Sequence, residues 1–478
     1  MSAITIRKIV RAVLALVLIL YMIFFSKKEK SALKVLWCFV FATNPYVGLV
    51  LYLIFGSTIV SSRLERRSKK RLYDRGYTEL PGRVNGTSFE NEESGLSDIS
   101  RDIAKFTYNY CHVPMSAYET EKIFTTGSSH YQQLFQDIRS AEHSVCILFY
   151  EIENDYIARE FMDLLTEKAA SGVPVFLMTD YLTGVGYFGR MARKLRKSGG
   201  EVIRVQPYLT HYRNHRKIVV IDHKTAYIGG MNIGKRFQNE DKVKTPWRDT
   251  QIRLTGCAVA DLEAYFLMDW FCNIPRKWMD REEHVADDYF AAGVGSGNEP
   301  CQFVTGGPTS KKESIRMVYL TMIRSARESI RIQSPYFVPD ETILDALRTA
   351  ASSGVSVEIM VPGVSSSFFL TPVTTYYCDE MLRCGAKIYR YNGYIHAKTI
   401  TVDGKVCSIG SANMDYRSLF LDDEVIGLFY DCPVVQEYEQ IYSEDITYCT
   451  TADPEEYRGR SGHWRRKTAF YRLFEYLL

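Results

Sequence analysis

An internal duplication constrains the fold of this chain more than any other feature. The stretch Ser140-Ala-Glu-His-Ser-Val-Cys-Ile returns as Ser325-Ala-Arg-Glu-Ser-Ile-Arg-Ile, and Ala169-Ala-Ser-Gly-Val-Pro-Val returns as Ala351-Ser-Ser-Gly-Val-Ser-Val. The offsets between these stretches are 185 and 182 residues. A nearly constant offset with small changes in loop length predicts one domain that is present twice. At 478 residues the chain has room for two or three ordinary domains.

Each copy alternates between strand and helix patterns. Short apolar runs, Val145 to Tyr150 and Ile330 to Tyr336, precede amphipathic stretches that predict helices. The next predicted strand of each copy is entered through Gly-Val, as expected after the end of a helix. Alternating strands and helices predict an α/β fold in which each copy is a mixed β-sheet flanked by helices.

Each copy also contains one pattern of polar residues, His-x-Lys-x4-Asp, followed after six residues by Gly-x-x-Asn. Its members are His215, Lys217, Asp222 and Asn232 in the first copy, and His396, Lys398, Asp403 and Asn413 in the second. Residues two apart in a strand point to the same face, so His and Lys project together from each sheet. Two such sets that face one another place two imidazoles, two ammonium groups and two amides around one space.

This collection of groups suits a phosphodiester. The ammonium and amide groups hold oxygens whose negative charge grows in the transition state. One neutral imidazole attacks phosphorus, while the other protonates the departing oxygen. A single His-x-Lys on a strand is usually a surface pair, but two copies with the same spacing predict one shared active site. No cofactor is required, and no His, Asp or Glu cluster has the spacing of metal ligands, so we expect metal-free chemistry.

The N-terminal residues predict a membrane anchor. Ile9 to Phe25 is apolar apart from Arg11, and Val35 to Ser62 carries no charge. At about 1.5 Å per residue both stretches are long enough to cross a bilayer, with a kink or a re-entrant turn expected at Asn44-Pro45. A cleaved signal peptide is the alternative for the first stretch, but the lysine-rich turn after it offers no small-residue cleavage site. We therefore predict two membrane helices.

Basic residues indicate the orientation of this anchor. Seven Lys and Arg residues lie from Arg63 to Arg75, which places the remainder on the cytoplasmic side and should attract anionic lipid head groups. The turn between the two apolar stretches holds four lysines, but the flank after the second stretch is heavier and longer. Eleven scattered cysteines without a CxxC pair indicate reduced thiols, as in the cytosol. We expect a multi-pass protein of the cell membrane with cytoplasmic catalytic domains.

The predicted division of the chain follows from these features. Residues 1–75 form the anchor with its basic flank, 76–100 a linker, 101–295 the first copy and 296–478 the second copy with a C-terminal amphipathic helix. In that helix Phe470, Leu473, Phe474 and Leu477 share one face close to several basic residues. Such a face suits either a membrane interface or packing on the protein's own core. Val364 to Thr375 is polar and apolar by turns, and it suits a lipid entrance as well as a plain loop.

The duplicated motif resembles the signature of the phospholipase D superfamily, HxKx4Dx6GSxN in two copies. The first copy departs from it, because Gly230 stands where Ser is usual, whereas the second copy keeps Ser411. The resemblance implies two tandem phospholipase D-like domains with one site at their interface and a covalent phosphohistidine. By the same resemblance His215 is the nucleophile, and His396 is the general acid and base.

The resemblance also implies a carboxylate behind each histidine, on the strand after the Asn, where it fixes the imidazole tautomer. Glu424 and Asp249 occupy these places. We expect three side chains to bind the substrate, namely Asn232, Asn413 and Ser411. Asp222 and Asp403 belong to the catalytic motif, but we expect them to cap the turn beside the site.

Further stretches narrow the resemblance to the bacterial cardiolipin synthases of this superfamily. These are Ser334-Pro-Tyr-Phe-Val-Pro-Asp340, Pro246-Trp-Arg-Asp249 and Asn413-Met-Asp-Tyr-Arg-Ser418, together with the paired apolar stretches at the N-terminus. The similarity covers nearly the whole chain. It implies that one phosphatidylglycerol transfers its phosphatidyl group to His215 with loss of glycerol. The hydroxyl of a second phosphatidylglycerol then attacks, which gives cardiolipin.

Other functions remain open at this point. A hydrolytic phospholipase D, or a phosphatidyltransferase that uses phosphatidylethanolamine as one substrate, would carry the same motifs. A nuclease would need a basic groove with stacking aromatic residues, and the clearest basic cluster instead adjoins the anchor, so no nucleic-acid partner is expected. A catalytically silent scaffold would have no reason to keep both motif sets. The residues carry no indication of oligomeric state.

Overall fold

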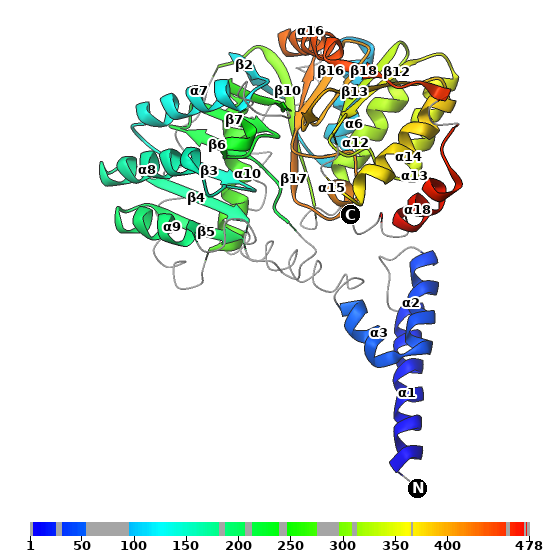
Figure 1. Cartoon of the computed structure of the whole chain (residues 1–478). Helices are drawn as coiled ribbons and strands as arrows, with labels where there is room; N and C mark the ends of the chain where they lie inside the picture. The colour runs from blue at the N-terminus through cyan, green and yellow to red at the C-terminus, as the bar shows by residue number, and fades with distance from the viewer. Residues whose placement is uncertain are drawn as a thin grey trace. The chain divides into compact units, whose positions relative to one another are not determined.

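The computed structural model divides the chain into two compact units, Met1–Lys70 with Pro207–Tyr212, and Arg71–Gln206 with Arg213–Leu478 (Figure 1). The structure describes residues 3–24, 31–53, 95–180, 187–205, 213–238, 246–274, 296–307, 313–364, 367–455, 459–472 and 475.

The N-terminal unit contains three helices, α1 (Ala3–Phe24), α2 (Ser31–Thr43) and α3 (Pro45–Leu51). The helices contact one another, and aromatic rings fill part of the space between them: Tyr52 contacts Trp37 and Phe41 edge to face. The chain breaks at the predicted kink. Asn44 caps α3 by accepting a hydrogen bond from the Val47 backbone, and a proline occupies the first turn, where its missing N–H costs nothing.

The two predicted membrane helices fall on α1 and on α2 with α3. Neither these nor any other helix within the described residues combines the length and the apolar character needed to cross a membrane. The end of the second apolar stretch, residues 54–62, and the basic flank up to residue 75 lie outside the described residues. Most of the predicted linker, residues 76–94, also lies outside them.

The larger unit is built from two β-sheets. The first has the order β2 (Glu121–Phe124), β9 (Gln251–Thr255), β7 (Thr225–Gly229), β6 (Ile218–Ile221), β3 (Val145–Phe149), β4 (Val175–Asp180) and β5 (Glu201–Val205). The second has the order β1 (Ser116–Tyr118), β10 (Glu299–Gly306), β17 (Glu424–Tyr430), β16 (Val406–Gly410), β15 (Thr399–Val402), β11 (Ser329–Gln333), β12 (Ser356–Pro362), β13 (Lys387–Tyr391) and β18 (Cys449–Thr451).

Apart from the edge strands β1 and β18, the two sheets have the same topology. In the first, β3, β4 and β5 are parallel and β6 runs antiparallel to β3. In the second, β11, β12 and β13 are parallel and β15 runs antiparallel to β11. The prediction of a duplicated α/β fold, with a mixed sheet flanked by helices in each copy, is confirmed.

Helices cover both sheets. In the first half these are α7 (Gly127–Ser140), α8 (Tyr156–Ala170), α9 (Tyr187–Lys197) and α10 (Ala258–Asn273). In the second half they are α12 (Ser314–Ser325), α13 (Glu341–Ser352), α14 (Leu370–Arg383), α16 (Pro433–Thr447) and α18 (Gly462–Arg472). One core is shared by the two halves: Leu148 and Ile218 of the first sheet, Trp270 of α10, and Ile409 and Phe429 of the second sheet belong to the same buried cluster. The halves therefore form one body.

Two elements at the start of this unit join the second half, although residues 101–295 were predicted to form the first domain. The strand β1 pairs with β10. The helix α6 (Asp98–Cys111) contributes Ile103 and Ala104 to the core under the second sheet. Among the described residues of this unit, the chain therefore starts on the second half, then forms the first half, and then returns.

Candidate active site

Each motif histidine lies just before a central strand, and the opposite half holds its backbone. His215 precedes β6, and its N–H donates to the carbonyl of Asp423, 2.8 Å away. His396 precedes β15, and its N–H donates to the carbonyl of Arg248, 2.6 Å away. The short strands β14 (Tyr394–Ile395) and β8 (Trp247–Arg248) pair in parallel at this point. The histidine-bearing segment of each half is thus fixed by the other half.

The carboxylates behind the histidines also come from the opposite half. His215 Nδ1 lies 2.9 Å from Glu424 Oε1, and His396 Nδ1 lies 2.6 Å from Asp249 Oδ2. Both carboxylates are buried, while each imidazole keeps 13% of its side-chain surface exposed. A bond at Nδ1 leaves Nε2 of each ring for chemistry. Because each half supplies the carboxylate of the other, neither half contains a complete site.

Two hydroxyl groups hold Glu424 in place. Ser411 donates to Oε2 of Glu424, and Ser418 donates to Oε1 over 2.7 Å. Ser411 was predicted to bind substrate; in the structure it is fully buried and its hydroxyl is committed to Glu424. Ser418 was not predicted, although it ends the stretch Asn413–Ser418 that carried the resemblance. Both serines restrict the carboxylate that orients His215.

The first half has a glycine where the second has Ser411, and the structure shows why. A Cβ atom built on Gly230 would lie 2.3 Å from Asp249 Oδ1. Asp249 is one methylene shorter than Glu424, so its carboxylate sits close to the backbone, where a serine side chain would stand. The two half-sites thus use different pairs of residues, Gly230 with Asp249 and Ser411 with Glu424, to place a carboxylate beside the Nδ1 atom of a histidine.

Each motif lysine contacts the backbone of the histidine that stands two residues before it. Lys217 Nζ donates to the carbonyl of His215 over 2.5 Å, and Lys398 Nζ donates to that of His396. Burial lowers the pKa of Lys217 to about 7 and the pKa of Lys398 to about 8. Desolvation disfavours the charged form of each ammonium. A bound anion would reverse this effect, so the site is set up to take up negative charge.

The imidazoles are neutral in the unliganded site. Burial, and then the charges of Lys217 and Lys398, hold the pKa of His215 well below its usual value. Burial and the charge of Lys398 lower the pKa of His396 to about 3, against the pull of Asp249. A neutral imidazole is the form that acts as a nucleophile or accepts a proton.

The two carboxylates differ in their electrostatics. Burial raises the pKa of Glu424 to about 7, although Lys217 and its serine partners act in the opposite direction. Burial also acts to raise the pKa of Asp249, but His396 and Lys398 outweigh it and hold that pKa below the usual value. The group behind His396 is thus firmly ionised, which suits a histidine that must become an imidazolium.

The remaining motif residues divide into two groups. Asn232 and Asn413 follow β7 and β16: Asn232 Oδ1 accepts a bond from the Glu151 N–H over 3.2 Å, and the Asn413 amide donates to Asp415 over 3.1 Å. Both asparagines are buried.

Asp222 and Asp403 lie at the other end of the strands that the histidines precede. The carboxylate of Asp222 accepts backbone N–H groups at the entry to β3, from Glu142, His143 and Ser144. That of Asp403 accepts the equivalent N–H groups at the entry to β11, from Arg327, Glu328 and Ser329. Their geometry is that of turn caps, and they support the sheet rather than reach the histidines.

Aromatic residues flank His396. The rings of Trp247 and Tyr394 lie 5.1 and 6.1 Å from the imidazole and 4.5 Å from one another. In the other half-site, the positions equivalent in spacing hold ionic residues: Asp422 stands two residues before Glu424, and Arg213 stands two residues before His215.

Beside His215 one aromatic ring is accompanied by an ion pair. The ring of Tyr150 lies 4.9 Å from its imidazole, and Arg417 pairs with Asp422 at 2.8 Å. We call the side of Trp247 and Tyr394, which give His396 two aromatic neighbours, the aromatic side of the site. The motif alone did not identify Trp247, Tyr394, Asp422 and Arg213. The sequence does show that each of them stands two residues before a motif histidine or before a carboxylate that lies behind a histidine.

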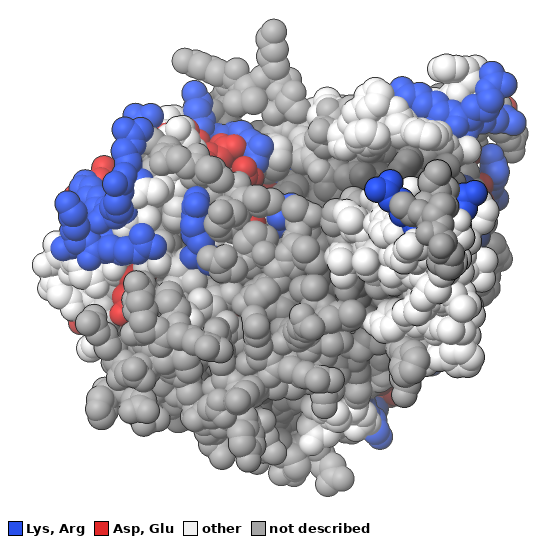
Figure 2. All heavy atoms as spheres, turned by 90° about the horizontal axis from the view of Figure 1, so that it is seen from below, with Lys and Arg blue, Asp and Glu red and all other residues white. Residues whose placement is uncertain are grey.

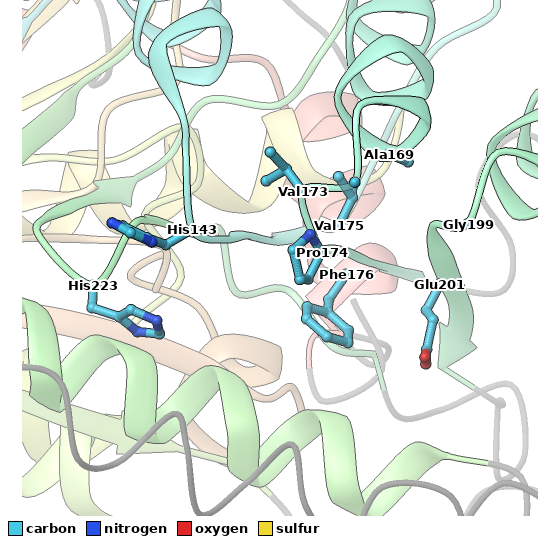
Figure 3. Close-up of a pocket in the computed structure, with 10 residues that line it drawn as sticks. His143, Ala169, Val173, Pro174, Val175, Phe176, Gly199, Glu201 and His223 are labelled. Atoms are coloured by element: carbon cyan, nitrogen blue, oxygen red, sulfur yellow. The ribbon is translucent and has the colours of Figure 1, made fainter.

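A cavity of about 540 Å³ lies away from the two histidines, at the opposite end of the strands of the first sheet (Figure 3). His143, Phe176, Glu201 and His223 are among its lining residues. These residues lie where β3, β4 and β5 begin and where β6 ends, whereas His215 precedes β6. No predicted site residue lines this cavity. Across the described part of the chain, no group of three or more His, Cys, Asp or Glu residues could hold a metal ion.

Known families match both parts of the chain. The family described as "Cardiolipin synthase, PLD-like domain", where PLD stands for phospholipase D, matches residues 134–243 and 319–446. These ranges contain both motif sets. The family described as "Phospholipase_D-nuclease N-terminal" matches residues 13–57.

Known proteins resemble the chain over almost its full length. The cardiolipin synthase of Listeria monocytogenes serotype 4a (strain HCC23) is 33% identical over 95% of both chains. The major cardiolipin synthase ClsA of Bacillus subtilis (strain 168) is 33% identical over 97% of both. The crystal structure of phosphatidylserine synthase from Haemophilus influenzae has a TM-score of 0.58 at 16% identity, covering 79% of this chain and 100% of its own, which shows a shared fold. The resemblance predicted from the motifs is confirmed, and the chain belongs to the cardiolipin synthase family of phospholipase D-type phosphatidyltransferases.

Proposed function

We propose that this enzyme joins two phosphatidylglycerol molecules into cardiolipin and releases glycerol. The observation that carries the proposal is the pair of histidines, each with a reactive Nε2 and a carboxylate of the opposite half at Nδ1. Such a pair can act on the two sides of one phosphorus atom. The relatives named cardiolipin synthase support the choice of lipid substrates.

In the first step, His215 Nε2 attacks the phosphorus of one phosphatidylglycerol. A P–N bond forms, the P–O bond to the glycerol head group breaks, and His396 gives its proton to the departing oxygen. The bound phosphate opposes the lysine charges that lower the pKa of His396, and Asp249 stabilises its protonated form. Glycerol leaves, and the phosphatidyl group stays on His215.

In the second step, the hydroxyl of another phosphatidylglycerol attacks the phosphohistidine. His396 takes the hydroxyl proton, the new P–O bond forms, and the P–N bond breaks to release cardiolipin. Lys217 and Lys398, with the amides of Asn232 and Asn413, hold the phosphoryl oxygens through both steps. Asp222 and Asp403 support the strands that carry these groups.

The substrates place the enzyme at a membrane. We propose that residues 1–75 attach it there and that the catalytic halves face the cytoplasm, where anionic lipids meet the basic flank. Figure 2 shows the molecule from below, where the described Lys and Arg residues gather at several places on this face.

The test is product analysis with the purified full-length protein and phosphatidylglycerol vesicles. Cardiolipin with an equal amount of free glycerol is the expected result. Phosphatidic acid as the sole lipid product would replace the proposal with hydrolysis. Vesicles that also contain phosphatidylethanolamine test the other alternative, because release of ethanolamine would show that this lipid is a donor.

A further inference from the structure

We propose that an aromatic and basic patch on the second half docks onto the head-group layer of an anionic bilayer. This docking patch consists of Phe368, Phe369, Arg465, Arg466, Lys467 and Phe470. The inference rests on the proposed function in so far as the substrates are bilayer lipids. It adds a second membrane contact, formed by the catalytic unit itself.

Three large apolar side chains of the patch face water. Phe368 is 65% exposed, Phe369 44% and Phe470 56%. They come from two segments that are about a hundred residues apart in sequence, yet all three surround Tyr471, with ring centroids 5.5, 5.3 and 5.9 Å from it. Tyr471 itself is buried in the core of the second half. The exposed rings are thus held on a fixed base, and clustered apolar surface of this kind marks an interaction site.

Positive charge surrounds these rings. From Gly459 to Arg472 the chain has five Lys and Arg residues and no Asp or Glu. The ammonium of Lys467 lies 4.7 Å from the centre of the Phe368 ring, and Arg465 and Arg466 are exposed on the same helix, α18. Aromatic side chains that enter the acyl boundary, next to cations that meet phosphate groups, are the composition of an interfacial surface.

The helix α18 packs on the protein with one face and leaves another face exposed. Thr468 and Tyr471 are buried, and α18 contacts α14, so one face packs on the protein. Phe470 remains exposed on the other side. Residues 473, 474 and 476–478, which include Leu473, Phe474 and Leu477 of the predicted apolar face, lie outside the described residues.

Phe368 and Phe369 of the patch follow the second sheet at the end of its strands where His396 lies. The strand β12 ends at Pro362, and Phe368 and Phe369 follow before α14 begins. In the sheet, β12 is separated from β15, the strand that His396 precedes, only by β11. The two strands are therefore about 10 Å apart. A bilayer under the patch would face the end of the sheet at which His396 lies, so that a lipid could enter head first while its acyl chains stay in the membrane.

The positive charge of the docking patch favours an anionic bilayer as its partner, and not a second copy of the chain. Two patches that each carry Arg465, Arg466 and Lys467 would repel one another, whereas phosphatidylglycerol and cardiolipin are anionic. An acidic protein surface is the remaining occupant, and the experiment separates it from the bilayer.

The experiment uses the full-length protein with two forms of one substrate, phosphatidylglycerol in vesicles and dihexanoyl-phosphatidylglycerol as dissolved monomers. The test variants are Phe368→Ser with Phe369→Ser and Phe470→Ser, and Arg465→Gln with Arg466→Gln and Lys467→Gln. The control is Tyr448→Ser, which removes another exposed aromatic side chain outside the patch (62% exposed).

We expect each triple variant to lose about tenfold in rate on vesicles and to stay within about twofold on monomers, because only the bilayer substrate needs docking. The loss in the charge variant should shrink at high salt. The control should match the wild type on both substrates. Equal losses on both substrates, or none on vesicles, would overturn the docking patch. So would a change of oligomeric state without a vesicle-specific loss, which would indicate a protein partner.

The outcomes of this test are separate from those of the proposed function. If the wild type releases phosphatidic acid in place of cardiolipin, the transferase proposal fails. The docking patch is then judged on phosphatidic acid release with the same two substrates and the same variants.

Discussion

Asp249 Oδ2 lies 2.6 Å from His396 Nδ1, although the two residues are 147 positions apart and belong to opposite halves of the enzyme. The reciprocal contact joins Glu424 to His215 across 209 positions. An exchange of carboxylates between halves makes the active site a property of the assembled pair. A single half, folded alone, would have a histidine without the group that orients it.

Replacing Asp249 with Asn should therefore abolish most activity without unfolding the enzyme. The amide keeps the size of the carboxylate but cannot stabilise the imidazolium of His396, and kcat should fall by roughly 10²–10⁴-fold, as for carboxylates behind other catalytic histidines. Cardiolipin formation at saturating lipid is the measurement, with the thermal midpoint as the check on folding. A variant that retains more than half of the wild-type kcat would show that Asp249 does not support a charged histidine.

Gly230→Ser should reduce activity because its side chain meets the carboxylate of Asp249. The added Cβ would lie 2.3 Å from Oδ1 and would push the carboxylate away from His396. The double variant with Asp249→Glu rebuilds the Ser–Glu combination of the other half and should regain part of the lost kcat. Rates of the wild type, both single variants and the double variant form a cycle. A double variant no faster than the slower single one would argue against matched pairs.

The pH dependence of anion binding should follow the two motif lysines. Their pKa values, about 7 and about 8, are below the ordinary lysine value, so both lose their charge as pH rises through this range. Sulfate, whose own charge is constant there, should inhibit well at pH 6.5 and more weakly at pH 9. Its binding should also be accompanied by proton uptake near pH 8, because an anion raises the lysine pKa values.

Lys217→Arg provides the control for this titration, since a guanidinium stays charged throughout the range. The inhibition constant of sulfate should then change less with pH than in the wild type. A wild-type inhibition constant that is the same at pH 6.5 and pH 9 would contradict the lysine assignment.

Much of this site was predictable from the sequence, because a duplicated spacing constrains which side chains face one another. The histidines and lysines of the two motifs lie close enough for Lys398 to lower the pKa of His215 and for Lys217 to lower that of His396. The exchange of carboxylates was not predictable, since a repeat is compatible with pairing within a half or between halves. The hydrogen bond from Ser411 to Glu424 was equally hidden, because a hydroxyl beside a site can face either the substrate or a neighbour.

The fold, like the site, was predictable from the sequence only in part. Apolar strands and Gly-Val entries at matching positions predicted two mixed sheets, because local pattern and duplication agreed. Local pattern could not predict that α6 and β1 join the second half, since this depends on contacts between distant segments. The kink predicted at Asn44-Pro45 in the second apolar stretch is where α2 ends, at Thr43, and α3 begins, at Pro45. A proline there removes a hydrogen bond of the continuous helix.

Two buried ion pairs involve α10 and α16, and the pair at α16 joins the two halves and should contribute strongly to stability. Arg216 binds Asp269 at 2.6 Å, and Arg248 binds Asp445 at 2.8 Å. Asp445→Ala would leave Arg248 buried without its charged partner, and we expect a loss of about 3–5 kcal/mol in the free energy of unfolding. Urea titration is the measurement. Replacing both members of the pair with apolar residues should cost less, and an equal loss would show that the charge is not the cause.

The aromatic side of the site should determine whether water or a lipid alcohol reaches the phosphohistidine. The rings of Trp247 and Tyr394 contact His396, which we propose deprotonates the incoming hydroxyl, whereas the equivalent positions beside His215 hold ionic residues. Trp247→Ala should open this side to water, which competes with the lipid hydroxyl wherever it is admitted.

We therefore expect the ratio of phosphatidic acid to cardiolipin to rise about tenfold in Trp247→Ala, with total turnover of phosphatidylglycerol less affected. Trp247→Phe keeps an apolar ring over His396 and should stay close to the wild-type ratio, so it serves as the matched control. Both products are measured in the same vesicle assay. If Trp247→Ala lowers both products in proportion, the tryptophan positions His396 and does not exclude water.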